Sequence, residues 1–452
     1  MPILRLSVLV IVFATFWTPS TAVGSSTLLL ARSRSLSPPN TGAPLTAWAA
    51  SIAAQSAADA SRVATLLAVP LLDVRRKSKG HSRGRSFVPI APGRQILSIP
   101  NYVARARIGT PAQTLLVAID PSNDAAWIPC SACVGCAPAA TSPSFSPTQS
   151  STYRPVHCGA PQCAQVPGAA SCPWGAGASC AFNLTYGSST FQAVLGHDVL
   201  ALEDGTGAAA SAYTFGCLRV VTGGSVPPQG LLGFGRGPLS FLSQTKDTYD
   251  SVFSYCLPSY KSSNFSGTLR LGPVGQPKRI KTTPLLYNPH RPTLYYVDMT
   301  GIRVGGKAVA VPASALAFDP ATGSGGTIVD AGTMFTRLSP PVYAAVRDAF
   351  RRRVRVPVSA PLGGFDTCYN VTVRVPSVAL TFSGGAAVNL PEENVMIHSS
   401  SGSVACLAMA AGPSDGVNAG LNVLASMQQQ NHRVLFDVAN RRVGFSREFC
   451  TA

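Results

Sequence analysis

The sequence predicts an all-β protein built as two related lobes, and three observations lead to this prediction. Its 452 residues exceed the size at which a single hydrophobic core usually stops growing, so two packed units are expected. From Ile99 onward, short apolar runs bounded by Gly, Pro, Asn or Ser follow one another, as in proteins made of many short strands. A unit of apolar run, aspartate and small residues occurs twice, at Asp120 and at Asp330.

The composition supports a folded, strand-rich chain. Hydrophobic residues make up 46% of the sequence and charged residues 12%. The 41 glycines and 37 prolines follow no fixed period, which indicates many turns rather than a collagen or a disordered polymer. The runs expected to be strands are YVARARIG, TLLVAID, LRLG, LYYVDMTGIRVGG, VRVPSVALTF, NVLASM and RVLFDVANRRVGF.

Helical patterns are few in this sequence. We expect one helix in PLSFLSQT after Gly237 and another in PPVYAAVRDAFRRRV, where Ser339 is placed to cap the helix and proline stands in its first turn. The basic run at 350–356 then falls at the end of a helix, where cations meet the negative end of the helix dipole. Because no stacking aromatics alternate with these arginines, a solvated surface is favoured and no nucleic-acid partner is expected.

The N-terminus has the pattern of a secretory signal peptide, assigned to residues 1–24. Arg5 precedes an apolar run from Leu6 to Trp17, and small residues follow around Ala22. The run is too short to span a bilayer, and no later segment is long and apolar enough, so the mature chain is expected to be soluble. A chloroplast transit peptide is the alternative, which the compact apolar run disfavours. We therefore expect secretion to the extracellular space (apoplast), with the vacuole or the chloroplast as alternatives.

Residues 25–86 are expected to form a removable basic prosegment. They contain no cysteine and end in RRKSKGHSRGRS, and the residues before Phe87 carry ten Lys or Arg against two Asp or Glu. About half of the formal net charge of +17 therefore lies there. A cationic segment can cover anionic functional groups until it is cleaved. The alternative is a solvated tail.

Twelve cysteines indicate disulfides formed in an oxidising compartment. The run CSACVGC could indicate zinc, but the even total and the secretory signal favour disulfides, so no metal site is predicted. Glycosylation is expected at the three sequons, Asn183, Asn264 and Asn370.

The two aspartate units are the candidate active site. VAIDPSNDAAWIPC surrounds Asp120 and TIVDAGTMFTRL surrounds Asp330. Each is followed downstream by an apolar run into glycine, QGLLGFG at 229–235 and RRVGF at 441–445. A turn or cap role for each acid is the simpler explanation, but it does not account for the repeat. Two similar lobes facing each other would bring one carboxylate from each to a shared axis.

These motifs resemble the pepsin-like aspartic proteases, specifically the plant nepenthesin and nucellin-like branch, some of whose relatives are described as chloroplast nucleoid DNA-binding proteases. The resemblance covers most of residues 95–452. Its carriers are the acid of VAIDPSND with Trp127 seven positions later, TYG at 185–187, IVDAGT at 328–333, and LFDVANRRVGF at 435–445.

The resemblance implies a bilobal fold with a long cleft, an N-terminal lobe at 87–285 with a cysteine-rich insertion, and a C-terminal lobe at 286–452. It implies an endopeptidase that acts as a monomer on a protein or peptide substrate and needs no cofactor. The implied catalytic residues are Asp120 and Asp330, with Tyr186 on a hairpin flap whose hydroxyl faces the indole N–H of Trp127. The other implied residues are Gly187, Gly332 and Thr333 as substrate-binding, and Ser122 and Asn123 as supporting the acids. The implied disulfides are Cys256–Cys450 and Cys368–Cys406.

The residue types suit this chemistry. Two carboxyls held close together cannot both ionise, so they share one proton. The ionised member can take a proton from water while its protonated partner polarises the scissile carbonyl.

The sequence departs from the family pattern directly after each acid. The family has a hydroxyl residue there, which bonds across to the opposite loop, but this chain has Pro121 and Ala331. Reduced activity is therefore expected. The alternative is a binding protein without activity, such as an inhibitor of cell-wall-degrading xylanases.

Overall fold

The computed structural model describes residues 45–66, 85–138, 141–166, 170–172, 177–203 and 209–450. The predicted signal peptide, and the predicted prosegment apart from 45–66 and 85–86, lie outside the described residues. Among the helices of the described ranges, none has the length and apolar composition that crossing a membrane requires.

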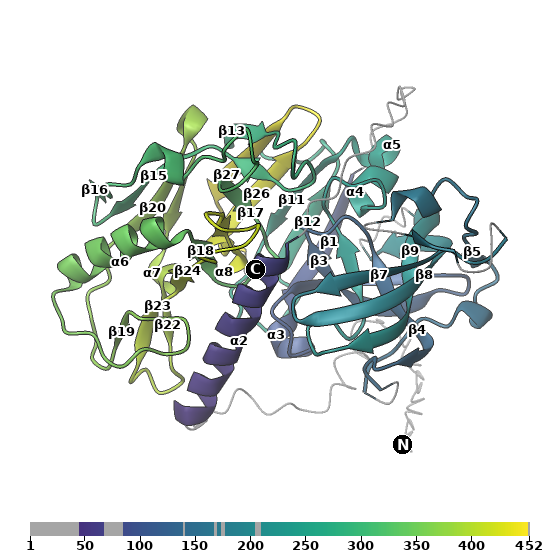
Figure 1. Cartoon of the computed structure of the whole chain (residues 1–452), viewed down its shortest axis with the longest axis horizontal. Coiled ribbons are helices and arrows are strands. Elements are labelled where there is room, and N and C mark those ends of the chain that lie inside the picture. Colours follow the sequence, from purple (N-terminus) through teal and green to yellow (C-terminus); the bar gives the residue numbers. More distant parts are fainter. Residues whose placement is uncertain are drawn as a thin grey trace, which may run out of the picture. The chain divides into compact units, whose positions relative to one another are not determined.

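The described residues between 86 and 450 form two lobes that share one antiparallel sheet (Figure 1), so the all-β, bilobal prediction is confirmed. Six strands pair successively across this sheet, one from the first half of the chain and five from the second. In spatial order they are β1 (Ser86–Pro92), β12 (Gly267–Leu271), β11 (Val252–Cys256), β26 (His432–Asp437), β27 (Arg442–Arg447) and β13 (Lys281–Leu286). The rings of Phe253 and Phe436 stack at its centre, with centroids 4.6 Å apart. The lobes are therefore joined through a hydrophobic core.

The N-terminal lobe is a set of long, mostly antiparallel strands. Its main strands are β2 (Tyr102–Ile108), β3 (Gln113–Asp120), β4 (Trp127–Val134), β7 (Ala181–Tyr186), β8 (Ser189–Leu202), β9 (Ala209–Thr222) and β10 (Leu231–Gly233), with the short β5 (Arg154–Pro155) and β6 (Ala170–Ser171). Strand β8 pairs with both β7 and β9, and β2 pairs with β3. The β7–β8 hairpin of this lobe points toward the C-terminal lobe in Figure 1.

The C-terminal lobe contains shorter strands in three groups. The strands near the predicted site are β14 (Tyr296–Val297), β17 (Thr327–Val329), β18 (Thr336–Leu338), β24 (Met409–Ala411) and β25 (Asn422–Leu424). A four-stranded sheet contains β16 (Lys307–Ala308), β15 (Met299–Val304), β20 (Val378–Phe382) and β21 (Ala387–Leu390). A three-stranded sheet contains β19 (Cys368–Tyr369), β23 (Ala405–Leu407) and β22 (Met396–His398).

Both predicted helices are present. PLSFLSQT contains α4 (Phe241–Gln244), where the Ser240 side chain accepts a hydrogen bond from the Ser243 N–H at 3.2 Å. The second is α6 (Pro340–Val354). Ser339 precedes α6 as expected, but its hydroxyl makes no capping bond, so the predicted side-chain cap is wrong. The remaining one-turn helices are α3 (Gly93–Ile96), α5 (Lys246–Tyr249), α7 (Glu392–Val395) and α8 (Ser426–Gln429).

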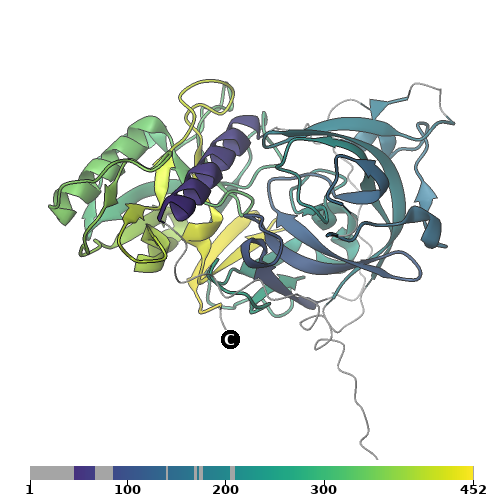
Figure 2. The same ribbon diagram turned by 90° about the horizontal axis from the view of Figure 1, so that it is seen from below.

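A second long helix, α2 (Leu45–Thr65), was not predicted from the sequence. It lies between the two lobes in Figures 1 and 2, within the range assigned to the prosegment. Its buried face carries Ile52 and Val63 with three polar residues between them, Ser56, Asp59 and Arg62. Ile52 packs against Phe335 and Phe365, and Val63 against Leu294 and Ile328. Helix α2 is therefore docked on the C-terminal lobe.

Candidate active site

Asp120 and Asp330 occupy equivalent positions in the two lobes. Strand β3 ends at Asp120 and runs parallel to β10, with Gly233 opposite Asp120. Strand β17 ends one residue before Asp330 and runs parallel to β25. Both aspartates are fully buried. The duplication inferred from the sequence is therefore present in the backbone pairing.

The second half of the predicted repeat is different. QGLLGFG does form β10, the parallel partner of β3. Its counterpart in the other lobe is β25, in the run NVLASM, whereas RRVGF lies in β27 of the shared sheet. The prediction that QGLLGFG and RRVGF are equivalent in the two lobes is wrong. An apolar run into glycine occurs at the end of many strands and does not identify one of them.

Each acid accepts a hydrogen bond from the backbone N–H of the residue two positions further along the chain. The Ser122 N–H donates to Asp120 Oδ1 at 2.9 Å, and the Gly332 N–H donates to Asp330 Oδ1 at 2.8 Å. Thr333 adds its hydroxyl, which donates to Asp330 Oδ2 at 2.6 Å. Asn123 stands three residues after Asp120, but among the described residues only its backbone is hydrogen-bonded.

Tyr186 supplies the second bond to Asp120. It lies at the tip of the β7–β8 hairpin, opposite Ser189, and is followed by Gly187 at φ +57°. Its hydroxyl donates to Asp120 Oδ2 at 3.2 Å and accepts from Asn101 Nδ2 at 3.2 Å. The hairpin therefore covers the acid from the N-terminal lobe.

The expected hydrogen bond between Tyr186 and Trp127 is absent. The two rings meet edge to face with centroids 5.2 Å apart, and the buried indole Nε1 has no hydrogen-bond partner within the described residues. Trp127 therefore supports the Tyr186 ring by packing, while the hydroxyl turns toward the acid.

Arg62 of helix α2 lies between the two acids, and sequence reasoning did not identify it. Its Nη2 is 2.9 Å from Asp120 Oδ1 and 3.3 Å from both carboxylate oxygens of Asp330. Its guanidinium carbon lies 5.1 Å from the centroid of the Tyr186 ring. A methyl group on Gly332 would lie 2.3 Å from that Nη2 and 2.7 Å from Asp120 Oδ1, so only glycine fits there. One guanidinium nitrogen thus bridges the carboxylates of the two lobes.

The electrostatics follow from burial and from these charges. Burial raises the pKa of Asp120, the nearby charge of Asp330 raises it further, and Arg62 acts against both. Burial opposes the charge of Arg62, but the two aspartates outweigh it and raise the pKa of the guanidinium. Arg62 is therefore a permanent cation held by the acid pair.

Helix α2 has further anchors on the C-terminal lobe. The Asp59 carboxylate accepts hydrogen bonds from the backbone N–H groups of Met334 at 3.1 Å and Phe335 at 2.8 Å. Arg337 donates to the carbonyl and the hydroxyl of Ser56. At the end of the helix, the Asn418 amide donates to the carbonyls of Val63, Ala64 and Leu66.

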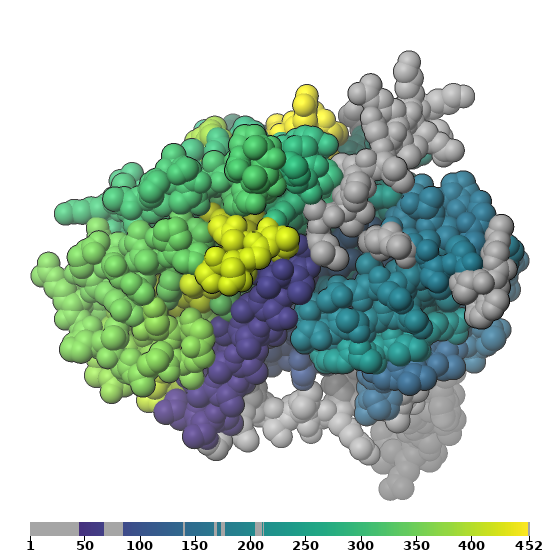
Figure 3. Space-filling model, in the orientation of Figure 1, coloured from purple at the N-terminus to yellow at the C-terminus, as the bar shows by residue number. Residues whose placement is uncertain are grey.

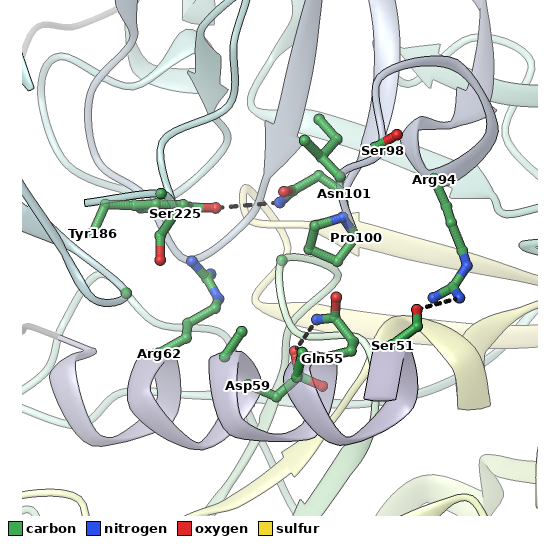
Figure 4. Close-up of a pocket in the computed structure, with 16 residues that line it drawn as sticks. Ser51, Gln55, Asp59, Arg62, Arg94, Ser98, Pro100, Asn101, Tyr186 and Ser225 are labelled. Carbon is green, nitrogen blue, oxygen red and sulfur yellow. Dashed lines mark hydrogen bonds between the residues drawn. The ribbon is translucent and has the colours of Figure 1, made fainter. Parts of the chain in front are cut away.

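On its other side the helix leaves a cavity of about 480 Å³ against the N-terminal lobe. Figure 4 shows Gln55, Asp59 and Arg62 lining it from the helix, with Asn101 and Tyr186 opposite. In the space-filling view of Figure 3, α2 lies at the surface with C-terminal-lobe residues on one flank and N-terminal-lobe residues on the other. Helix α2 therefore forms one wall of the cavity next to the two acids.

The remaining predicted residues lie away from this space. The three sequon asparagines, Asn183, Asn264 and Asn370, have exposed side chains. The structure pairs Cys256 with Cys450 and Cys368 with Cys406, as the resemblance implied. The first-lobe cysteines form the pairs Cys130–Cys217, Cys133–Cys136, Cys158–Cys172 and Cys163–Cys180.

Two β lobes, each presenting one aspartate at the end of a strand, define the acid-protease fold, and comparison with known proteins agrees. Two family models match, "Xylanase inhibitor N-terminal" over residues 102–273 and "Xylanase inhibitor C-terminal" over residues 294–447. Solved structures with the same fold include edgp, with a TM-score of 0.65 at 22% identity over 82% of this chain and 97% of that one. Basic 7S globulin from soybean has a TM-score of 0.62 at 22% identity, over 80% of this chain and 96% of the globulin.

Curated relatives are much closer in sequence. Aspartyl protease 25 of Oryza sativa subsp. japonica is 47% identical over 82% of this chain and 87% of its own length. Aspartyl protease AED3 of Arabidopsis thaliana is 48% identical over 80% of each chain. Aspartic proteinase nepenthesin-2 of Nepenthes gracilis is 34% identical over 78% of each. The chain belongs to the pepsin-like aspartic protease family, in its plant branch.

Proposed function

We propose that this chain is a secreted aspartic endopeptidase, made as a zymogen in which helix α2 blocks the catalytic acids. One observation carries the proposal: the carboxylates of Asp120 and Asp330, from equivalent loops of the two lobes, both bind the same guanidinium nitrogen of Arg62. Two acids this close can share a proton once the cation has left. Close relatives named aspartyl proteases support the same activity.

In the proposed mechanism the Arg62 guanidinium stands where a water molecule and the scissile peptide bond would lie. The ionised carboxylate takes a proton from the water as its oxygen attacks the carbonyl carbon. The protonated carboxyl gives its proton to the carbonyl oxygen. The carboxyl that took the proton from water then gives it to the amide nitrogen as the C–N bond breaks. A hydroxyl of the tetrahedral diol returns its proton to the other carboxylate, so the pair again holds one shared proton.

The loops after the acids support each role. The N–H groups of Ser122 and Gly332 and the hydroxyl of Thr333 hold the two carboxylates in place. Tyr186 closes over Asp120 and would exclude water from a bound peptide. Pro121 and Ala331 provide no hydroxyl between the loops, so we propose a slower enzyme than one that carries both hydroxyls.

Secretion and glycosylation are part of this proposal. The signal-peptide pattern, six disulfides and three exposed sequon asparagines suit passage through an oxidising secretory route. The extracellular space is the expected destination.

A binding protein without activity is the second candidate. The two matching family models are described by the words "xylanase inhibitor", and Pro121 and Ala331 depart from the protease pattern. Such a protein would need a surface that fills another enzyme's site and would not need both acids.

The test uses the full chain with a specific protease recognition sequence inserted after Lys77. After folding, the chain is cut there and the released N-terminal piece is washed away; this product is called the cut chain. We expect the cut chain to cleave a denatured protein between pH 3 and pH 6, and the uncut chain to be far slower. Asp120→Asn in the cut chain should abolish cleavage. A cut chain that is inactive, or cleavage that survives Asp120→Asn, would decide against the endopeptidase and leave the binding protein.

A further inference from the structure

The Asp59 carboxyl occupies a built site on the C-terminal lobe. Its two oxygens take one backbone N–H each, Oδ1 from Met334 at 3.1 Å and Oδ2 from Phe335 at 2.8 Å. Asp59 is 1% exposed, and the only other hydrogen bond to it in the described residues comes from Gln55 of its own helix, at 3.0 Å. Two N–H groups side by side match the two oxygens of a carboxyl group.

Arg337 adds positive charge to this site. It lies two residues after Phe335, is 3% exposed, and interacts favourably with Asp59. Its Nη2 donates to the carbonyl of Ser56 and, at 2.8 Å, to its hydroxyl, while Nη1 donates to the Ala411 carbonyl at 3.2 Å. Its Nε has no hydrogen-bond partner within the described residues.

Release of helix α2 would leave the donors of this site without most of their partners. Arg337 would lose both acceptors on Ser56 and the opposite charge of Asp59, and would keep only the Ala411 carbonyl. A guanidinium and two unpaired N–H groups would then face the cleft together. Such a group of donors binds acids well, because each hydrogen bond to a charged partner is stronger than a neutral one.

We propose that the N–H groups of Met334 and Phe335, together with the Arg337 guanidinium, form a binding site for an acidic side chain of the peptide substrate, which Asp59 occupies until helix α2 leaves. The proposal rests on the proposed function and names its substrate class, peptides with aspartate or glutamate near the scissile bond. An asparagine or glutamine would accept from only one of the two N–H groups. A lysine would be repelled by Arg337.

The position of the site relative to the acids follows from the helix. Asp59 and Arg62 are three residues apart, so their positions differ by about 4.5 Å along the helix axis. An extended peptide advances about 3.3 Å per residue. The acidic residue is therefore expected within about three residues of the scissile bond.

The first arm of the test measures cleavage by the cut chain at pH 5. Peptide pairs that differ only by Asp against Asn, or Glu against Gln, are compared at each of the four positions on either side of the scissile bond. We expect one position at which the acidic peptide has a kcat/KM at least about tenfold higher. The preference should vanish in Arg337→Gln and be partly kept in Arg337→Lys. The matched control is Arg94→Gln, because Arg94 also lines the cavity and contacts the helix, through Ser51 at 3.1 Å, but is not among the groups that act on the Asp59 carboxyl; its preference should be unchanged.

The second arm needs neither catalysis nor an Arg337 variant. A synthetic peptide of residues 45–66 and its Asp59→Asn form are titrated into the cut chain that carries Asp120→Asn, at pH 5, by fluorescence anisotropy. We expect the Asn peptide to bind at least about tenfold more weakly. Equal affinities, or cleavage with no acidic preference at any position, would overturn the proposed site. A cut chain that cleaves nothing but still prefers the Asp59 peptide would overturn the protease and keep the site.

Discussion

The loops that follow Asp120 and Asp330 have the same frame and carry different side chains. In each, a backbone N–H two residues after the acid binds its Oδ1, and the residue seven positions after the acid pairs with the strand that runs parallel to the acid's own strand. That seventh residue is Trp127 in one lobe and Arg337 in the other. The shared frame places the acids, and the variable side chain determines what each lobe presents to the cleft.

The two side chains face different neighbours. Trp127 is fully buried and packs its ring against Tyr186 and Phe191, so the N-terminal lobe supports its hairpin with apolar surface. Arg337 contacts Ser56 and lies near Asp59, so the C-terminal lobe presents a cation to whatever occupies the cleft. At this position one lobe thus presents an apolar ring and the other a positive charge.

Removing either acid is expected to have the largest effect on activity. If the two loops are chemically equivalent, Asp120→Asn and Asp330→Asn should each lower the kcat/KM of the cut chain by about a thousandfold or more, because neither acid can share a proton with an amide. Peptide cleavage at pH 4 measures the loss. Asp319→Asn, on the exposed surface, is the control and should stay within about twofold of the wild type. Unequal losses, with one variant still active, would argue that only one acid acts.

Replacing the bridging cation should have the next largest effect. Arg62→Gln removes the positive partner of a buried ion pair, a change worth about 3 to 5 kcal/mol. Docking of helix α2 should weaken accordingly, so the uncut chain should become more than about a hundredfold more active. The rate of peptide cleavage before any cut at Lys77 measures this. An uncut variant as inactive as the wild type would show that the other anchors of the helix suffice.

The second polar anchor of the helix predicts a pH dependence. Burial raises the pKa of Asp59 to about 6 from its ordinary 3.8, although Arg337, the two N–H groups and Gln55 lower it. The docked helix holds the proton of Asp59 more tightly than the free helix does. The affinity of the helix for the lobe should therefore rise as the pH falls from 6 toward 4, by up to about tenfold per pH unit. The affinity ratio of the wild-type 45–66 peptide to its Asp59→Asn form should therefore rise by about a hundredfold between pH 7 and pH 4. Both peptides carry the same Arg62 to the same acid pair, so a ratio independent of pH would contradict this assignment.

The smallest expected effect concerns the missing hydroxyl. Ala331→Ser restores a hydroxyl next to Asp330, and one net hydrogen bond is worth about 0.5 to 1.5 kcal/mol. The cut chain should become up to about tenfold faster, measured as kcat on a good peptide. An unchanged or lower rate would mean that the buried loop offers this hydroxyl no acceptor.

The sequence predicted the two acids from their repeated pattern and α6 from its cap and first-turn proline, whereas the hairpin tyrosine was implied by the family resemblance. It missed helix α2, although nine alanines favour a helix there, since the buried stripe of this helix is polar in its middle. Ser56, Asp59 and Arg62 make polar contacts with the two lobes. The hydrophobic periodicity of the helix is therefore interrupted at the residues that bind the lobes. The contacts of Arg62 with Asp330 and of Asp59 with Met334 join residues more than 250 positions apart, and no local pattern contains them.

The hydrogen bond expected between Tyr186 and Trp127 is a second point on which the structure differs from the prediction. Its place after Asp120 was predicted, yet its indole N–H has no partner within the described residues, while Tyr186 bonds to Asp120 instead. Arg62 lies beside both Asp120 and the Tyr186 ring. The Tyr186 hydroxyl therefore joins this polar cluster and does not bond to the indole of Trp127.

The most direct measurement of the central claim is the binding of a statine-type inhibitor, whose hydroxyl would stand between the two carboxylates in place of Arg62. Isothermal titration at pH 4 should show tight binding to the cut chain, binding to the uncut Arg62→Gln chain, and little or none to the uncut wild type. An inhibitor that binds the uncut wild type as tightly as the cut chain, or that binds neither, would contradict the claim that Arg62 occupies a working pair of acids.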